Sequence, residues 1–203
     1  MLTNAGEMRM ASEFEKLVLN SSLARGLRYK EMVLEDLGEI NRPGIGKLLE
    51  YLETSDFFTA PASTKFHRAY GGGLCEHSSN VEDLFAKRNG AMGKPINDES
   101  VVICGYLHDA CKIGYYEKAG NSYKSVKGHP AGSAHAKLSI EIIEKFIELH
   151  AIERELILYH MNLFGCYGYC VEYTPKDLYS AIARNPSVQV FAACDMEESK
   201  WMD

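Results

Sequence analysis

The stretch Val101-Val-Ile-Cys-Gly-Tyr-Leu-His-Asp-Ala-Cys-Lys112 is the most informative part of this chain. It is largely apolar, yet an imidazole and a carboxylate, His108 and Asp109, stand side by side near its end. Burying both groups without partners would be costly, because water no longer solvates them. A bound metal ion is the simplest partner for such a pair. Further residues of ligand type stand elsewhere in the chain: His77, His129, His160 and Asp195.

The size and composition of the chain predict a single soluble domain. Its 203 residues, with 46% hydrophobic content, are enough for one sizeable core. No stretch approaches the ~20 consecutive apolar residues of a membrane-spanning helix, and no basic region followed by an apolar run opens the chain. We therefore expect a cytoplasmic protein with no membrane partner.

The cysteine pattern does not change this expectation. Three of the six cysteines, Cys104, Cys111 and Cys194, stand in apolar, helix-like sequence, where a free thiol behaves as a small hydrophobe. The pair Cys166-Tyr-Gly-Tyr-Cys170 is a weak signal for zinc or a disulfide, because no second spaced pair accompanies it. Two reduced thiols in a loop are the favoured interpretation.

The charge of the chain is acidic overall and basic near the predicted ligands. A net charge of −6 argues against broad binding to extended nucleic acid. Between Cys111 and Pro130, however, four lysines stand against Glu117 alone, and Lys65 and Arg68 precede His77. Local positive charge can steer an anionic ligand against the global sign. This pattern favours an anionic substrate, and ordinary solvated lysines on loops are the alternative.

The apolar periodicity predicts helices nearly throughout and therefore an all-α fold. We expect one domain over residues 1–203, with an N-terminal helical extension over 1–40 and a core over 66–199. Loops are expected over 54–73 and 164–173, where they would shape substrate choice, and a short strand or hairpin over 121–127. The expected helices cover residues 12–23, 45–52, 74–87, 98–112, 131–149, 152–161, 175–183 and 186–201.

Three of the predicted ligands lie on apolar helical stripes. His77, His108 and Asp195 each have apolar neighbours at steps of three and four residues, so their side chains should point inward. A lone buried carboxylate is rare and carries a heavy desolvation cost, which a divalent cation removes. For any single histidine, a hydrogen-bonded core position is an equal alternative.

The motifs around these residues resemble the HD-domain superfamily of metal-dependent phosphohydrolases. Its signature, H…HD…D, appears as Gly73-Leu-Cys-Glu-His77, Leu107-His-Asp-Ala-Cys-Lys-Ile-Gly114 and Ala192-Ala-Cys-Asp195. The sequence of residues 66–77 is similar to the corresponding motif in the HD domain of bacterial 3′–5′ exoribonucleases. The resemblance covers roughly 66–199 and implies a helical bundle with the metal site between core helices.

The resemblance also implies a set of metal ligands. In members with two metals, two further histidines lie between the HD pair and the final Asp, one of them often preceded by Gly. Gly128-His129 and Tyr159-His160 occupy these places, whereas His135 and His150 fall outside the motifs. The implied arrangement is one metal at His77, His108, Asp109 and Asp195, and a second held by bridging Asp109, His129 and His160. Mixed nitrogen and oxygen ligands suit iron, manganese, nickel or zinc.

Such a site implies hydrolysis of a phosphate ester by a metal-activated water. The substrate would be a small phosphorylated compound or a nucleotide. Asp109 and Lys112 are the predicted catalytic residues, because Lys112 follows His108 by one helical turn and can touch a phosphate oxygen. Lys112, Arg68 and His67 are the predicted substrate contacts. The alternative for Lys112 is a lysine that simply ends a helix.

Three other functions stay open from the sequence. Some HD-fold proteins with the same ligands are di-iron oxygenases that cleave carbon–carbon or carbon–phosphorus bonds with O₂, and Lys112 does not separate these from hydrolases. A 3′–5′ exonuclease-like phosphodiesterase is a variant of the hydrolase. A non-catalytic, ligand-sensing HD domain is disfavoured, because such a domain would be expected to have lost ligand residues.

Overall fold

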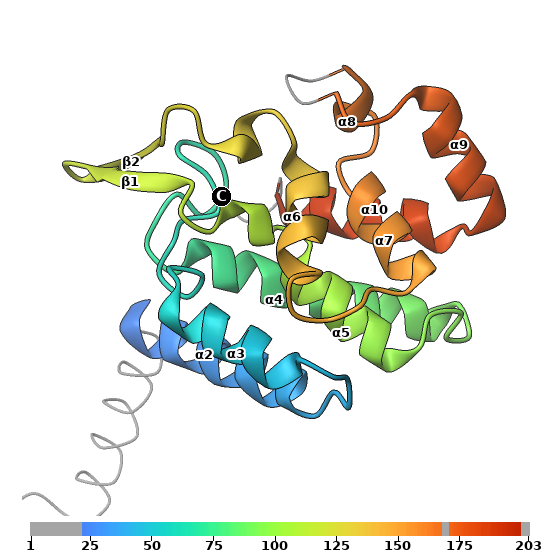
Figure 1. The fold of residues 1–203 in the computed structure, drawn as a ribbon, viewed down its shortest axis with the longest axis horizontal. Coiled ribbons are helices and arrows are strands. Elements are labelled where there is room, and N and C mark those ends of the chain that lie inside the picture. Colours follow the sequence, from blue (N-terminus) through green and yellow to red (C-terminus); the bar gives the residue numbers. More distant parts are fainter. Residues whose placement is uncertain (1–21, 168–170, 200–203) are drawn as a thin grey trace, which may run out of the picture.

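The computed structural model describes residues 22–167 and 171–199, which form a helical molecule with one short hairpin (Figure 1). The all-α prediction is therefore confirmed. Its elements are α2 Ser22–Gly38, α3 Ile45–Thr54, α4 Gly73–Ala91, α5 Asp98–Leu107, the 3₁₀ helix η1 Ala110–Lys112, β1 Tyr116–Ala119, β2 Ser122–Ser125, the 3₁₀ helix η2 Pro130–Gly132, α6 His135–Ile143, α7 Ala151–Tyr159, α8 Phe164–Tyr167, α9 Pro175–Arg184 and α10 Ser187–Glu198.

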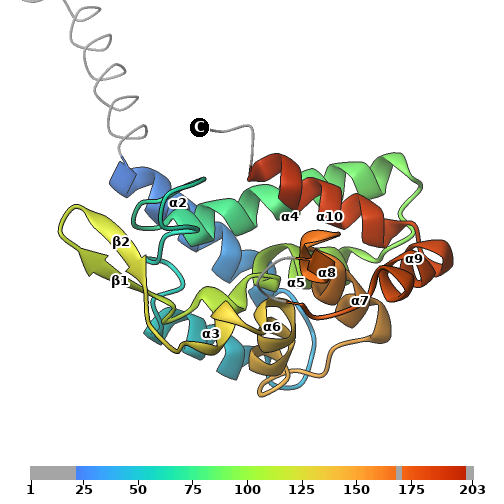
Figure 2. The same cartoon turned by 90° about the horizontal axis from the view of Figure 1, so that it is seen from above.

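Helices α4 and α5 lie side by side at the centre of the molecule. Gly105 allows this close packing, because a Cβ at that position would lie 2.5 Å from the Cβ of Glu82. Helix α10 covers α4 on one side, where the rings of Phe85 and Phe191 meet with centroids 4.9 Å apart (Figure 2). Helix α2 packs on α4 from another side and contributes the buried side chains of Val33 and Leu37 to the same core.

The turn before α4 uses glycine for two physical reasons. Gly72 has a left-handed backbone with φ of 85°, which a side chain disfavours. Gly73 has no room for a side chain, because a Cβ there would lie 2.1 Å from the carbonyl oxygen of Arg68. The three consecutive glycines thus let the preceding loop return close to the first turn of α4, four residues before His77.

Helix α5 ends just before the paired His108 and Asp109. Its start is as predicted, since the Asn97 side chain accepts a hydrogen bond from the backbone N–H of Ser100 over 2.8 Å. The pair itself was expected inside the helix, and this expectation is wrong: His108 caps α5 and Asp109 precedes η1. Despite the change of helix type at this point, the two adjacent side chains face each other, with Nε2 of His108 3.5 Å from Oδ2 of Asp109.

The bounds of the hairpin and of one helix differ from those expected from the sequence. The hairpin is confirmed, although its strands begin at Tyr116, earlier than predicted. The helix expected over 131–149 is instead η2 followed by α6, which begins at His135 and ends at Ile143. The helix expected over 12–23 lies almost wholly outside the described residues. Among the helices that the structure describes, none is both long and apolar enough to cross a bilayer.

Candidate metal centre

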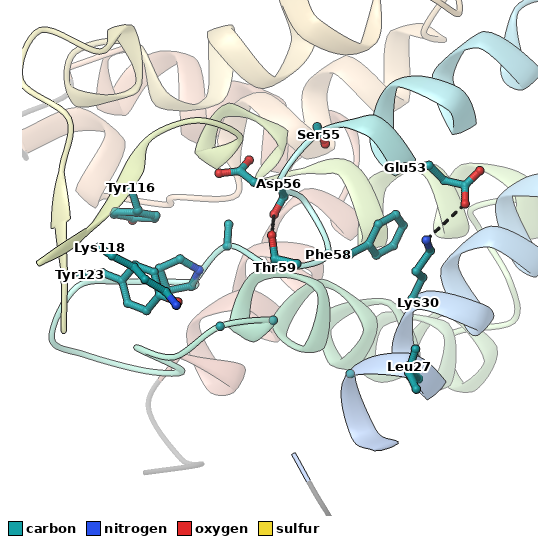
Figure 3. A pocket seen from close by; sticks show the side chains of 15 residues that line it. Leu27, Lys30, Glu53, Ser55, Asp56, Phe58, Thr59, Tyr116, Lys118 and Tyr123 are labelled. Carbon is teal, nitrogen blue, oxygen red and sulfur yellow. Dashed lines mark hydrogen bonds and ion pairs between the residues drawn. The ribbon is translucent and has the colours of Figure 1, made fainter. Parts of the chain in front are cut away.

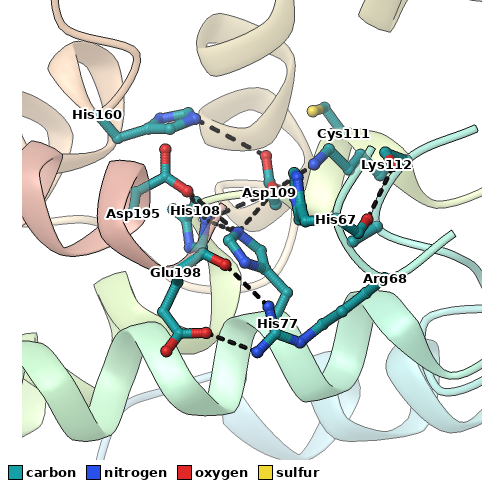
Figure 4. Close-up of polar contacts among 12 residues, drawn as sticks. His67, Arg68, His77, His108, Asp109, Cys111, Lys112, His160, Asp195 and Glu198 are labelled. Carbon is teal, nitrogen blue, oxygen red and sulfur yellow. Dashed lines mark hydrogen bonds and ion pairs between the residues drawn. The ribbon is translucent and has the colours of Figure 1, made fainter. Parts of the chain in front are cut away.

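Five separate elements bring imidazoles and carboxylates to one buried place (Figure 4). Helix α4 contributes His77, the end of α5 contributes His108 and Asp109, and α10 contributes Asp195. His160 caps the end of α7, and His135 is the first residue of α6. The sequence separations are large, so only the packing of the helices around α4 and α5 creates the cluster.

The first half of the cluster gathers around the Nε2 atom of His77. This atom lies 3.1 Å from Oδ1 of Asp195 and 3.3 Å from Nε2 of His108. Both imidazole Nε2 atoms lie 3.5 Å from Oδ2 of Asp109. Two imidazole nitrogens and oxygens of Asp109 and Asp195 thus lie close together, and these are the four residues that the HD resemblance implies for one metal.

The second half of the cluster uses the other oxygen of the same aspartate. Oδ1 of Asp109 lies 2.7 Å from Nε2 of His135 and 3.7 Å from Nε2 of His160. His77, His108 and Asp109 have the spacing needed to hold a metal ion, as do Asp109, His135 and His160, and the two groups share Asp109. One carboxylate therefore faces both groups, one oxygen to each.

Backbone carbonyls orient two of the imidazoles. Nδ1 of His108 lies 2.9 Å from the carbonyl oxygen of Gly105, and Nδ1 of His160 lies 2.6 Å from that of Ile157. A carbonyl can only accept, so each Nδ1 carries a proton, and in the neutral ring Nε2 holds the lone pair that faces the cluster. Nε2 of His160 is buried and has no hydrogen-bond partner.

This unpartnered nitrogen tests whether the residues fit a metal. A buried lone pair beside a buried carboxylate is unfavourable unless a donor or a cation lies between them. A divalent cation satisfies both groups at once, and imidazole with carboxylate is a donor set typical of transition metals. The residues therefore fit the group that they were predicted to hold.

The protonation of His77, His160 and the two carboxylates points in the same direction, whereas, against the effect of burial, the neighbouring acidic groups raise the pKa of His108 and His135. Burial lowers the pKa of His77 and of His160 to about 4, so both rings are neutral near pH 7. Burial alone would raise the pKa of Asp109 and Asp195, but the positive charge and hydrogen bonds around them hold both well below the usual value. Neutral imidazoles and ionised carboxylates are the forms that bind metal.

The comparison with known protein families agrees with this geometry. A family model described as the HD domain matches residues 74–194, more than half of the chain. The chain belongs to the HD-domain family. Members of this family are in general metal-dependent hydrolases. Comparisons with curated proteins and with solved structures gave no match.

One ligand expected from the HD resemblance is misplaced, because His129 lies outside both groups. Its Nδ1 accepts a hydrogen bond from the backbone N–H of Ala131 over 3.2 Å and so caps η2, while its ring packs on Tyr115. His135, to which the sequence analysis gave no role, lies where His129 was expected. The other predicted ligands, His77, His108, Asp109, His160 and Asp195, come together.

The predicted substrate contacts have different surroundings. Nζ of Lys112 lies 2.6 Å from Oδ2 of Asp109, and burial would lower its pKa, but Asp109 raises it above the usual value. His67 packs its half-buried ring 4.9 Å from that of His77, and its Nε2 is buried without a partner. Arg68 is instead engaged by Glu198 and Glu76, so its guanidinium does not face the cluster as an open phosphate contact.

Four contacts hold the first turns of α6, and therefore His135, in place. Both carboxylate oxygens of Glu172 accept backbone N–H groups of α6, over 2.9 Å from Ala136 and 2.8 Å from Lys137. The Ser139 hydroxyl accepts the backbone N–H of Cys111 over 3.0 Å, and Sγ of Cys111 lies 3.3 Å from Nδ1 of His135. Sequence motifs gave no sign of the roles of Glu172 and Cys111.

A cavity of about 710 Å³ lies apart from the cluster, between α2, the loop after α3 and the hairpin (Figure 3). Its walls include Phe58, Tyr116 and Tyr123, and the ion pair between Lys30 and Glu53, 3.3 Å apart, lies at one side. None of the clustered histidines or aspartates lines it.

The spaced cysteines Cys166 and Cys170 lie elsewhere in the sequence. Cys166 is a free, buried thiol, and Cys170 lies outside the described residues.

Proposed function

We propose that this chain is a dinuclear metal-dependent phosphohydrolase that cleaves a phosphate ester of a small phosphorylated compound or nucleotide. The proposal narrows the family assignment in two respects, the number of metals and the class of substrate. The single observation that carries it is the position of Asp109, whose two oxygens face two different pairs of imidazoles.

The ligand residues form two sets, one for each proposed metal. His77, His108, Asp109 and Asp195 would hold one, and Asp109, His135 and His160 the other. Iron, manganese, nickel and zinc all suit this donor set. When bound, such a pair supplies an activated water as nucleophile at neutral pH and offsets the charge that develops on phosphate oxygens.

The side chains beside the metals would bind the phosphate. The side chains of Lys112, Asp195 and His135 are the most exposed of the proposed metal site, at 10%, 11% and 12%. The Lys112 ammonium would contact one phosphate oxygen. Burial lowers the pKa of His67 to about 4, with a contribution from Lys112, so its neutral ring would offer a single N–H to another oxygen.

The depth of the cluster supports a small substrate. His77, His108 and His160 are at most 1% exposed, whereas the side chains of Lys112, Asp195 and His135 are 10%, 11% and 12% exposed, so a phosphate would approach past these three residues. A terminal or lone phosphate suits this approach better than the backbone of an extended nucleic acid. The net charge of −6 supports the same choice.

Metal content and hydrolysis together test the proposal. Protein purified without chelator and without added metal is assayed by elemental mass spectrometry and then for release of phosphate from a panel of sugar phosphates and nucleotides. We expect close to two transition metals per chain and phosphate release that does not need O₂. A strict requirement for O₂ would replace the proposal with the di-iron oxygenase, and preference for short RNA with the exonuclease.

Two matched variants locate the activity. Asp109→Asn keeps the shape of the side chain but removes the shared charge, so we expect loss of both metals and a fall in activity of more than about 100-fold. His129→Ala removes an imidazole that caps η2 outside the cluster, so we expect wild-type metal content. Full metal content in Asp109→Asn, or a single metal in the wild type, would contradict the dinuclear site.

A further inference from the structure

We propose that the Cys111 thiol is a positioning residue for the second metal, because it is the hydrogen-bond partner that lets the His135 imidazole act as a ligand. The inference rests on the proposed function, since it requires a metal between Asp109, His135 and His160. It concerns a side chain that no motif singles out, two residues after the shared aspartate.

His135 differs from the other oriented imidazoles in the partner of its Nδ1 atom. His108 and His160 each donate from Nδ1 to a backbone carbonyl, which can only accept. Nδ1 of His135 instead lies 3.3 Å from the sulfur of Cys111, within the range of a hydrogen bond to sulfur. A thiol can donate its S–H and can also accept at sulfur, so it suits either form of the ring.

The His135 ring needs a partner that can both donate and accept, because its Nε2 atom carries a proton before metal binds. Nε2 of His135 lies only 2.7 Å from a carboxylate oxygen of Asp109, so in this structure it carries a proton and donates it. In the neutral ring, Nδ1 is then the acceptor and the S–H of Cys111 is the donor. A nitrogen that holds a proton cannot bind a metal.

Metal binding therefore requires the proton to change position on His135. One proton leaves Nε2 and one is held on Nδ1, so the neutral ring neither gains nor loses a proton overall. The sulfur of Cys111, 3.3 Å from Nδ1, is placed to accept this N–H.

The surroundings of Cys111 hold the sulfur in this position. The residue is fully buried in η1, and its backbone N–H donates to the Ser139 hydroxyl over 3.0 Å. Asp109 and Cys111 stand two residues apart in the same short turn, and they hold the two nitrogens of His135 between them. An apolar side chain at position 111 would leave the Nδ1–H of a metal-binding His135 without this partner.

Cobalt(II) titration of the metal-free protein tests the inference. We compare the wild type with Cys111→Ala, which removes the partner, and Cys111→Ser, which keeps a donor and acceptor. Calorimetry should show the first metal unchanged and the second bound about 10- to 100-fold more weakly in the alanine variant, with most of the affinity restored by serine. If alanine prevents folding, Cys111→Val fills the space with an apolar group, and the same weakening is expected.

The control removes a different buried thiol. Cys104 is also fully buried, and its Sγ contacts the carbonyl oxygen of Glu153, so Cys104→Ala should leave both cobalt affinities at the wild-type level. Unchanged second-metal binding in Cys111→Ala would overturn the inference while leaving the dinuclear site intact. A sulfur-to-cobalt charge-transfer band in the wild type would also overturn it, because Cys111 would then be a ligand. A wild type that binds one cobalt would refute the proposed function itself.

Discussion

At the scale of single residues, Arg68 joins the loop before α4 to the end of α10. Its Nη1 donates to the carbonyl oxygen of Glu198 over 3.0 Å, and its Nη2 donates to the Glu198 carboxylate over 2.7 Å. Nε lies 3.5 Å from the carboxylate of Glu76 on α4. Because Glu198 follows Asp195 by one helical turn, Arg68 holds the helix that presents Asp195.

This geometry predicts that Arg68→Ala acts through stability and metal binding. The substitution leaves the largely buried carboxylate of Glu198 without its partner, so we expect a loss of about 3 kcal/mol of unfolding free energy. The His77–Asp195 metal should bind more weakly as α10 shifts. Urea unfolding and metal titration measure the two effects.

A double-mutant cycle separates this role from substrate binding. Glu198→Ala should reproduce most of the Arg68→Ala effect, and the double variant should add little, because the two side chains act as a pair. If Arg68 served only to bind substrate, Glu198→Ala would be harmless. If the effects of the two single substitutions added in the double variant, Arg68 and Glu198 would not act as a pair that holds α10 against the loop before α4.

At the scale of elements, α6 shows why part of the site could not be predicted. The ligands His77, His108 and Asp195 stand on apolar stripes, so local pattern and motif were enough to find them. The first residue of α6 has no local capping signal, because Ala134 precedes it without a side-chain cap. Its cap comes from Glu172, 36 residues later, and a contact of that range is invisible in a local pattern.

The misplaced helix start explains the choice of His129. Because the helix was expected to begin at Ala131, His129, which follows a glycine, was expected at its N-terminus in a position suited to a ligand. A usable signal was present further along: Ser139, Ile142 and Ile143 are buried, and His135 lies one turn before Ser139 on the same stripe. The helix face extends back to His135 and not to His129, which η2 separates from it.

The distal cap leads to a prediction for Glu172. Glu172→Ala removes a carboxylate that accepts two backbone N–H groups at the helix N-terminus, so we expect a loss of about 1–2 kcal/mol of unfolding free energy. Because α6 begins with His135, the second metal should also be lost before the first. Thermal unfolding and elemental analysis of the purified variant measure both effects.

The control for this variant lies on the same helix. Glu141 is on the exposed face of α6, so Glu141→Ala should leave both the stability and the metal content unchanged. Retention of two metals in Glu172→Ala would mean that packing alone positions His135. Equal destabilisation by the two substitutions would assign the effect to helix propensity and not to the cap.

At the scale of the whole molecule, one buried ion-pair network connects the segment before α3 with α5 and α7. The carboxylate of Glu153, which is fully buried, accepts from both terminal nitrogens of Arg42, over 2.7 and 2.6 Å. It also accepts the Ser100 hydroxyl and the backbone N–H of His150. The network lies away from the metal cluster, so it reports on the stability of the fold and not on catalysis.

The protonation of Glu153 sets the pH range in which this network stabilises the fold. Burial alone would raise its pKa, but Arg42 and Ser100 outweigh burial and hold the pKa below the ordinary value of about 4.3. A carboxyl whose pKa is lower in the folded than in the unfolded state contributes stability above the unfolded pKa. That contribution disappears as the pH falls through the folded pKa.

Glu153→Gln therefore has a pH-dependent effect. Near pH 7 the variant should be less stable than the wild type by about 3 kcal/mol, because the largely buried guanidinium of Arg42 loses its main partner. The difference should shrink below about pH 4.3, where Glu153 becomes protonated in the unfolded wild type, and disappear as the pH falls through the lower pKa of the folded state. Urea unfolding from pH 7 to pH 3 measures this difference in stability.

The control is Glu99→Gln, because the Glu99 carboxylate contacts the same arginine but is 37% exposed. This substitution should lower the unfolding free energy much less at every pH. A Glu153→Gln deficit that stays constant down to pH 3 would mean that Arg42 is stabilised without an ionised Glu153.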